Sequence, residues 1–332
     1  MTIHDIAKEA CVSISSVSRF FNHPELLSEE TRKKISNVLD KNSFIPNQMA
    51  RGLSMNTAKT VGIMMSDIQH QRFSAIAYNL ERTFFDRGYN TLFCNIGDDW
   101  RKTQQYLYML ASKRVDAVIL IGSIFGNFDI ADLIMNYIAD IPVITSDIEL
   151  DLPNCYSVTP DHKYGMREAI QHLTHRGHKH IAFVASTNSV NTNQKIDAFY
   201  RTLMEYNLPL HSNENVIRVP LSRREDPELN FSSFLESTNI PYTGLIFSTD
   251  QMASRAVSSF TYHGHRVPDD YAVIGYDNSP YALCCQPPLT CIDVQTKTIA
   301  RVITNLVSDL FDQREVGNHI IIKPKLVIRS ST

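Results

Sequence analysis

The sequence lacks the features of a secreted or membrane-bound protein. None of its six cysteines stands in C-x-x-C spacing, and a chain of 332 residues needs no disulfide bonds to be stable, so a reducing compartment is expected. The amino terminus has neither the basic start nor the apolar stretch of a signal peptide. The most apolar run, Val115 to Phe125, is too short to span a bilayer. We therefore expect a soluble, cytoplasmic protein with no membrane partner.

Motifs of common enzyme classes are also missing: the sequence contains no G-x-G-x-x-G, G-x-x-x-x-G-K-[ST], G-x-S-x-G or H-E-x-x-H. Histidines gather only between His172 and His180, where four of nine residues are histidine. Gly177 in this stretch is typical of the residue that follows a helix, and basic side chains suit the negative end of a helix dipole. A structural role is favoured over adventitious metal binding, and we expect no enzymatic activity, metal or cofactor.

An excess of positive charge is absent as well. Lys and Arg total 32 against 35 Asp and Glu, which gives a formal net charge of −3. Residues 1–58 carry a net charge of +1 and the remainder carries −4. This balance excludes a protein that coats nucleic acid over its whole surface, so any polyanion must be contacted locally.

The sequence pattern changes near residue 60. Residues 1–45 show helical spacing without a strand-like run, whereas the rest alternates buried-strand candidates with amphipathic stretches of helical length. The sequence contains about ten pairs of a strand and a helix, which is more than one doubly wound sheet usually holds. We therefore expect an α/β body with two lobes built on parallel sheets. The clearest strand candidates are Val61–Met65, Ala117–Ile121, Ile181–Ala185, Gly244–Phe247 and Tyr271–Gly275.

Three short helices are predicted at the amino terminus. Thr2, Ser13 and Ser28 each stand at an N-cap position before apolar residues at helical spacing, and a tight turn separates the first two helices. This is the arrangement of a helix-turn-helix unit, whose second helix reads base edges in the major groove. From spacing alone, a helical interaction domain with a serine-rich solvated face explains the pattern equally well. The exposed face of the second helix offers Ile14, Ser15, Ser16 and Arg19.

The stretch from Thr2 to Asn22 reads T-I-x-D-I-A-x-x-A-x-V-S-x-x-x-V-S-R-x-x-N and resembles the DNA-binding signature of the lac repressor (LacI/GalR) family. The resemblance continues through residues 28–32, 45–47 and 50–53 to the carboxyl terminus, and so covers the whole chain. It implies a sequence-specific transcriptional regulator, most often a repressor, which binds a pseudo-palindromic operator in double-stranded DNA. No leucine heptad follows the core before Thr332, so a homodimer is expected instead of a tetramer.

The resemblance also implies which side chains of this headpiece, residues 1–45, contact DNA. It places Ile14, Ser15 and Arg19 against bases. One departure is Phe44, because many family members have a tyrosine there, and phenylalanine keeps the ring but lacks the hydroxyl that could bond a phosphate. Phosphate contacts are implied for Thr2, Ser13, Ser18, Asn22, Ser28 and Thr31.

Residues 46–58 are expected to form a hinge helix. Pro46 suits a first helical turn, and Gly52 makes such a short helix marginal on its own. In the family this helix folds on operator DNA and inserts a leucine into the minor groove, a role that falls here to Leu53 with support from Asn47 and Ala50. An apolar wedge of this kind unstacks a base step at a cost of a few kcal/mol. A plain linker with Leu53 packed on the body is the alternative.

By the same resemblance, residues 59–332 have the fold of periplasmic sugar-binding proteins, in which two lobes clamp a small ligand. Lobe one is expected at about 59–157 and 288–317, and lobe two at about 158–287 and 318–332. Parallel sheets hold ligands at the carboxyl ends of their strands. The implied effector contacts are Phe73, Asp147, Lys195, Thr249 and Asp277.

These residue types suit a carbohydrate effector. A carboxylate accepts two hydroxyl hydrogen bonds, and an aromatic ring covers the apolar face of a sugar. Asp250 is expected instead to cap a helix. Lys195 and Ala198 depart from the arginine and glycine usual in relatives, and lysine lacks the bidentate fork, so a different ligand is plausible. Control by a partner protein, a transport-type solute receptor and an enzyme with an unfamiliar site remain alternatives.

Overall fold

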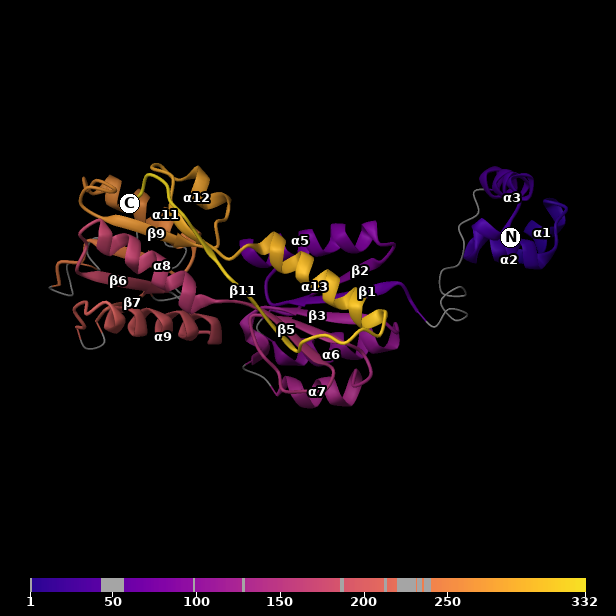
Figure 1. Cartoon of the computed structure of the whole chain (residues 1–332), viewed down its shortest axis with the longest axis horizontal. Coiled ribbons are helices and arrows are strands. Elements are labelled where there is room, and N and C mark those ends of the chain that lie inside the picture. The colour runs from indigo at the N-terminus through magenta and orange to yellow at the C-terminus, as the bar shows by residue number, and fades with distance from the viewer. Residues whose placement is uncertain are drawn as a thin grey trace. The chain divides into compact units, whose positions relative to one another are not determined.

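The computed structural model describes residues 2–42, 57–97, 99–126, 129–185, 188–211, 214–219, 231, 235 and 240–332. Contacts divide the chain into two compact units, Met1–Ala58 and Lys59–Thr332, which we call the headpiece unit and the body. Figure 1 shows the helices and strands of each unit. Among the described residues, no helix has the length and apolar character needed to cross a bilayer.

The three predicted helices of the headpiece are confirmed. Thr2 and Asp5 form a reciprocal capping box, since the Asp5 N–H donates to the Thr2 hydroxyl and the Thr2 N–H donates to the Asp5 carboxylate. Ser13 and Ser28 accept the N–H groups of Ser16 and Thr31. These caps start α1 (Ile3–Glu9), α2 (Ile14–Asn22) and α3 (Glu29–Lys41), with a 3₁₀ turn at Pro24–Leu26. The helices pack on a small core of Ile6, Ala7, Ala10, Val17, Ile35 and Val38.

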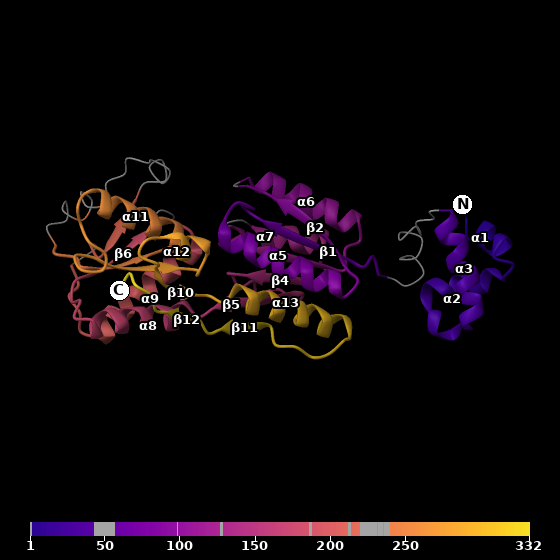
Figure 2. The same ribbon diagram turned by 90° about the horizontal axis from the view of Figure 1, so that it is seen from above.

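The first lobe of the body is built on a parallel sheet of six strands in the order β11-β5-β4-β3-β1-β2. Helices α5 and α13 lie side by side on one face, and α6 and α7 cover the other (Figures 1 and 2). The strands are β1 (Thr60–Met65), β2 (Asn90–Asn95), β3 (Ala117–Ile121), β4 (Val143–Ser146), β5 (Cys155–Pro160) and β11 (His319–Ile322). The helices are α5 (Gln71–Asp86), α6 (Trp100–Ser112), α7 (Ile130–Tyr137) and α13 (Thr296–Phe311), and a 3₁₀ turn spans Ser123–Gly126.

The second lobe repeats this plan with the strand order β12-β10-β9-β8-β6-β7. Only β12 runs antiparallel to its neighbour. Helices α8 and α9 pack on one face of the sheet and α11 and α12 on the other. The strands are β6 (Ile181–Ala185), β7 (Val216–Arg218), β8 (Gly244–Phe247), β9 (Ala272–Tyr276), β10 (Thr290–Asp293) and β12 (Lys325–Val327). The helices are α8 (His162–His175), α9 (Val190–Glu205), α11 (Asp250–Tyr262) and α12 (Pro280–Cys284).

The predicted two-lobed α/β architecture is therefore confirmed. Four of the five strand candidates lie within observed strands, and Tyr271–Gly275 was placed one residue early relative to β9. Central strands such as β3 and β6 are buried along their whole length because helices cover both faces, which explains their uninterrupted apolar runs.

The predicted lobe boundaries were wrong by several residues, each too early in the chain. Strand β5 continues to Pro160 in the first sheet, β10 belongs to the second sheet and β11 to the first. Each of these strands is hydrogen-bonded to its own sheet up to its last residue. The chain therefore passes from one lobe to the other in the short link after the strand. These links lie at residues 161, 294–295 and 323–324.

Candidate functional site: a helix-turn-helix face and an inter-lobe cleft

The amino-terminal face of α2 presents the side chains predicted to read DNA bases. Ile14 is 46% exposed, which is unusual for an isoleucine beside a small core, and Ser15 and Arg19 are exposed as well. The Ser13 hydroxyl lies 2.7 Å from that of Ser15 and 2.9 Å from that of Ser16, so the three serines form one hydroxyl cluster at the start of the helix. An apolar group, hydroxyls and a guanidinium on one exposed helix face are suited to base edges and phosphates.

Four of the six predicted phosphate contacts lie at helix starts. Thr2, Ser13 and Ser28 are the N-caps of α1, α2 and α3, and the Thr31 hydroxyl lies 2.9 Å from the Ser28 hydroxyl in the first turn of α3. Helix amino termini attract anions through their dipoles and free N–H groups. Ser18 is exposed on α2, and Asn22 is the last residue of that helix. The hinge residues Asn47, Ala50 and Leu53, and Phe44, lie outside the described residues.

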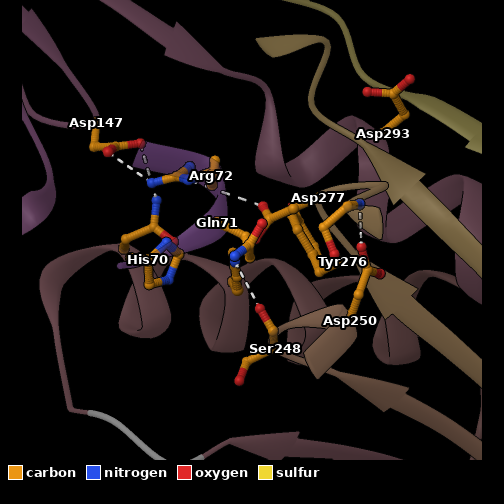
Figure 3. A network of polar contacts seen from close by, with 12 residues as sticks. His70, Gln71, Arg72, Asp147, Ser248, Asp250, Tyr276, Asp277 and Asp293 are labelled. Atoms are coloured by element: carbon orange, nitrogen blue, oxygen red, sulfur yellow. Dashed lines mark hydrogen bonds and ion pairs between the residues drawn. The ribbon is translucent and has the colours of Figure 1, made fainter. Parts of the chain in front are cut away.

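In the body, the carboxyl ends of strands from both lobes meet around one buried guanidinium. Asp147 directly follows β4 in lobe one and Asp277 directly follows β9 in lobe two. Between them lies Arg72 from the first turn of α5 (Figure 3). Its Nη2 donates to Asp147 Oδ2 at 2.6 Å, and its Nε lies 3.9 Å from Asp277 Oδ1. All three side chains are at least nine-tenths buried.

The opposite charges in this cluster stabilise each other's ionised forms. Burial alone would lower the pKa of Arg72, but the carboxylates of Asp147 and Asp277 outweigh it and raise that pKa. Burial raises the pKa of Asp147, and the guanidinium of Arg72 opposes this change. A contact of 2.6 Å is typical of a charge-assisted hydrogen bond. We therefore treat Arg72 and Asp147 as an ion pair.

A chain of hydrogen bonds continues from Asp147 into lobe two. Asn191 Nδ2 donates to Asp147 Oδ1 at 3.5 Å and lies 2.9 Å from His162 Nε2. His162 Nδ1 lies 2.7 Å from the Tyr276 hydroxyl. Since Nε2 faces a donor, this network assigns the proton to Nδ1. Burial holds the pKa of His162 well below its ordinary value, which agrees with a neutral ring.

The predicted effector residue Lys195 is fully engaged within lobe two. Its Nζ donates to the Ser248 carbonyl at 3.1 Å and lies 3.7 Å from the centre of the Tyr276 ring. Burial lowers the pKa of Lys195 to about 8, partly against the attraction of Asp277. Phe73 is only partly buried and stacks on His70, with ring centres 4.2 Å apart.

The prediction that Asp250 caps a helix was wrong. Thr249 is the N-cap of α11 and accepts the Met252 N–H, whereas the Asp250 carboxylate accepts the N–H of Ser279. This cross-connection is possible because Gly275 has no side chain: a Cβ at Gly275 would stand 2.2 Å from Asp250 Oδ1. Burial raises the pKa of Asp250 to about 8, with a further contribution from Asp277.

A cavity of about 20 Å³ lies between the lobes beside this cluster, with room for about one water molecule. Four buried polar atoms of its lining have no hydrogen-bond partner among the described residues: His70 Nδ1, Asp250 Oδ1, Asp277 Oδ1 and Ser279 Oγ. Unpaired buried polar atoms are costly, so four of them on residues that line one cavity indicate a candidate ligand site. Thr249 lines the same cavity. A wider groove of about 380 Å³ opens beside Asp147 and His162.

Three of the five predicted effector residues, Asp147, Lys195 and Asp277, thus join one buried network, while Thr249 and Phe73 lie at its edge. Sequence reasoning missed Arg72, His162 and Asn191. They share one signal, since each lies in the first turn of a helix that follows a buried parallel strand. The positive end of the helix dipole disfavours a cation in the first turn, so the position of Arg72 indicates that it needs an anionic partner.

The histidine-rich stretch has structural partners. Gly177 follows α8 with φ of 92°, as predicted for the residue after a helix. His172 Nε2 lies 2.8 Å from the Thr332 hydroxyl and His178 Nδ1 lies 3.0 Å from that of Thr243. In the part of the chain that the structure describes, no three His, Cys, Asp or Glu side chains are grouped to hold a metal ion.

Both units match known families. Residues 2–47 match bacterial regulatory proteins of the lacI family, and residues 170–332 match a periplasmic binding protein-like domain. An HTH-type transcriptional regulator of Lachnoclostridium phytofermentans is 30% identical over 334 residues, which cover 100% of this chain and 99% of the relative. The HTH-type transcriptional repressor PurR of Mannheimia succiniciproducens is 30% identical over 332 residues, with 99% and 98% of the two chains covered.

Solved structures agree in fold. The lac repressor dimer bound to operator and the anti-inducer ONPF has a TM-score of 0.86 at 22% identity, with 100% of this chain and 98% of that chain covered. The complex of the transcriptional regulator CelR with cellobiose has a TM-score of 0.71 at 21% identity, with both chains covered completely. The full-length relatives, the headpiece and the two-lobed body lead to one conclusion: this chain is a transcriptional regulator that belongs to the lacI family of bacterial regulatory proteins.

Proposed function

We propose that this regulator represses transcription by binding a pseudo-palindromic operator as a homodimer in the cytoplasm. We further propose that a small carbohydrate bound between its lobes changes its affinity for the operator. The observation that carries the second proposal is the cavity between the lobes, since four of the residues that line it, drawn from both lobes, carry unpaired buried polar atoms. In this arrangement of the lobes the cavity holds about one water molecule, so the proposal requires the lobes to move apart to admit a carbohydrate.

The DNA-binding part of the proposal rests on the headpiece. The exposed face of α2 offers Ile14, Ser15 and Arg19 to base edges, and the N-caps of the three helices offer hydroxyls and N–H groups to phosphates. The predicted DNA contacts include no lysine, and the whole chain carries a net charge of −3. We therefore expect a modest dependence of operator affinity on salt for a DNA-binding dimer.

The effector part rests on the chemistry of the cleft. Asp277 Oδ1 is an acceptor site, and Asp250 Oδ1 can donate because burial raises the Asp250 pKa to about 8 while Oδ2 accepts the Ser279 N–H. The Ser279 hydroxyl both donates and accepts, and His70 adds a ring nitrogen. A neutral polyol supplies hydroxyls of both kinds. The ion pair between Arg72 and Asp147 already balances its own charges, so the cleft does not require a charged ligand.

Binding between the lobes provides a route from effector to DNA. A ligand that prefers one arrangement of the lobes by about 1–3 kcal/mol changes operator affinity roughly 5–150-fold. The direction of the change follows from which arrangement the hinge residues 46–58 need in order to fold on DNA. In the proposed scheme Asn47, Ala50 and Leu53 act at this step.

A gel-shift titration with DNA flanking the gene itself tests the operator-binding proposal, with scrambled DNA of the same length and composition as control. We expect a salt-sensitive shift that favours the flanking DNA by at least about 10³-fold. Equal affinity for the two DNAs would refute sequence-specific binding. Thermal unfolding with a panel of pentoses, hexoses and disaccharides, ribose and cellobiose among them, then identifies the effector, since a ligand raises stability by RT ln(1 + [L]/Kd).

A further inference from the structure

Arg72 is the one side chain of the described cluster that contacts carboxylates of both lobes. Its guanidinium bonds Asp147 of lobe one at 2.6 Å and lies 3.9 Å from Asp277 of lobe two. Its position is fixed further by the Phe73 ring, whose centre lies 5.3 Å from the guanidinium carbon. Figure 3 shows the guanidinium between the two carboxylates. We call this arrangement the Arg72 tie.

Each carboxylate oxygen of Asp147 already accepts a hydrogen bond from the protein. Asp147 Oδ2 accepts from Arg72 and Oδ1 accepts from Asn191, so both oxygens are occupied by protein donors. Asp277 differs, because its Oδ1 is 3.9 Å from Arg72 Nε and has no hydrogen-bond partner. Arg72 Nη1 is also buried without a partner. Within the tie, the unpaired groups are therefore the Arg72 Nη1 donor and the Asp277 Oδ1 acceptor.

Lys195 does not replace the guanidinium in this role. Its ammonium already bonds the Ser248 carbonyl and lies over the Tyr276 ring. Without Arg72, the two buried carboxylates on opposite lobes would retain only the longer-range attraction of the Lys195 ammonium, which bonds the Ser248 carbonyl instead. Removal of one partner from a buried ion pair is strongly destabilising because it leaves an uncompensated charge.

We propose that Arg72 ties the two lobes together and is a specificity-determining residue of the cleft, with Asp147 as its positioning partner instead of a direct effector contact. The tie requires a ligand that offers an acceptor oxygen to Arg72 Nη1 and a donor hydroxyl to Asp277, as a neutral polyol does. The part that concerns the ligand rests on the proposed function. The tie itself is tested without DNA or effector.

The test compares hydrogen–deuterium exchange of the full-length protein with that of Arg72→Ala. We expect the amides of Asp277 and Ser279 in lobe two, and that of Gly122 in lobe one, to exchange at least about tenfold faster in the variant. Arg82→Ala is the matched control, because Arg82 lies on the same helix and is exposed. Its guanidinium donates to the Tyr78 hydroxyl at 2.9 Å, within the same helix. Wild-type exchange rates in Arg72→Ala would overturn the proposal.

Adding small molecules to Arg72→Ala distinguishes a role of the Arg72 charge from a role of its volume alone. Guanidinium ion at millimolar concentration, far below its denaturing range, should restore slow exchange in Arg72→Ala. Urea has nearly the same shape but no charge and should not. Equal rescue by both compounds, or by neither, contradicts the proposal.

A second variant keeps the test decisive if Arg72→Ala does not fold. Asp277→Asn weakens the contact of Arg72 with lobe two and leaves its bond to Asp147 in place. Faster exchange at Gly122 in lobe one therefore supports the tie, and unchanged exchange there refutes it. Failure of the tie leaves operator binding untouched, since the gel shift of the wild-type protein tests that function separately.

Discussion

Asp147 and Asp277 occupy equivalent places in two different sheets, and both have left-handed backbones. Each directly follows a buried strand, with φ of 120° at Asp147 and 98° at Asp277. Such values at residues other than glycine cost on the order of 1–3 kcal/mol each and persist where the surroundings impose them. Here the shared contact with Arg72 stabilises the pair, so backbone strain is concentrated where the two lobes meet.

Asp277→Asn should strongly weaken the response to effector while operator binding is retained. The amide keeps the size of the side chain but loses the charge that makes Oδ1 a strong acceptor, and a hydrogen bond to a charged group is worth about 1.5–3 kcal/mol. Gel shifts titrated with the effector would measure this as a dose response at least about tenfold weaker. Asp269→Asn, an exposed partner of Arg266, serves as control. An unaltered dose response would show that Asp277 is not an effector contact.

Gly275→Ala should destabilise the second lobe. The added Cβ would stand 2.2 Å from Asp250 Oδ1, and the Asp250 backbone is only 3.4 Å away, so the carboxylate cannot keep its bond to the Ser279 N–H. Overpacking of this kind costs about 1–3 kcal/mol, and the lost hydrogen bond adds to it. Urea unfolding measures the difference. Gly317→Ala is the matched control because a Cβ there meets nothing within 4 Å. Equal stability of the two variants would contradict the close approach.

Asp250→Asn should make stability less dependent on pH. Burial raises the Asp250 pKa from 3.8 to about 8, so the folded state binds this proton more tightly than the unfolded state. The contribution of Asp250 to stability is therefore largest at acidic pH and falls as pH rises towards 8. Asparagine still accepts the Ser279 N–H and carries no charge. At pH 9 we expect the variant to be more stable than the wild type by about 2 kcal/mol or more.

Chemical unfolding at pH 5, 7 and 9 checks this expectation. The Lys195 pKa, lowered to about 8, titrates in the same range, but it is present in both proteins and largely cancels in their difference. A difference between variant and wild type that stays constant from pH 5 to 9 would refute a raised Asp250 pKa.

The features that the sequence predicted well are local. Thr2, Ser13 and Ser28 were recognised as caps because an N-cap side chain bonds an N–H only two or three residues ahead. Buried strands such as β3 were recognised because parallel strands covered on both faces are continuously apolar. Neither inference needs knowledge of distant contacts.

The features that escaped prediction depend on residues far apart in the chain. Arg72 and Asp147 are 75 positions apart, and only the meeting of strand ends brings them together. Asp250 was taken for a helix cap because its contact with Ser279 depends on the space left by Gly275 in another strand. Strand β11 was assigned to the wrong lobe because an edge strand with alternating exposure carries no local mark of its sheet.

Arg19→Ala should relax operator specificity and leave the headpiece folded. Arg19 is exposed on α2, so its loss removes no core contact, whereas a bidentate arginine–guanine pair is worth about 1–3 kcal/mol of discrimination. Binding to a library of single-base operator variants would locate the effect at one position in each half-site. Arg32→Ala, an exposed residue of α3, is the control. A uniform loss of affinity across all operators would indicate a phosphate contact instead.

Leu53→Ala should lower operator affinity roughly 10–100-fold without changing the body. The resemblance to the lacI family assigns Leu53 to a wedge in the minor groove, and such a wedge unstacks a base step so that the bent DNA contacts more of the protein. Alanine is too small to hold the step open, so the cost of bending is no longer offset by those contacts. Fluorescence anisotropy with labelled operator measures the loss, and thermal unfolding verifies the body. Met55→Ala removes an apolar side chain from the same segment and should have little effect. If both variants bind operator like the wild type, the segment is a plain linker and the lobes must influence DNA binding by another route.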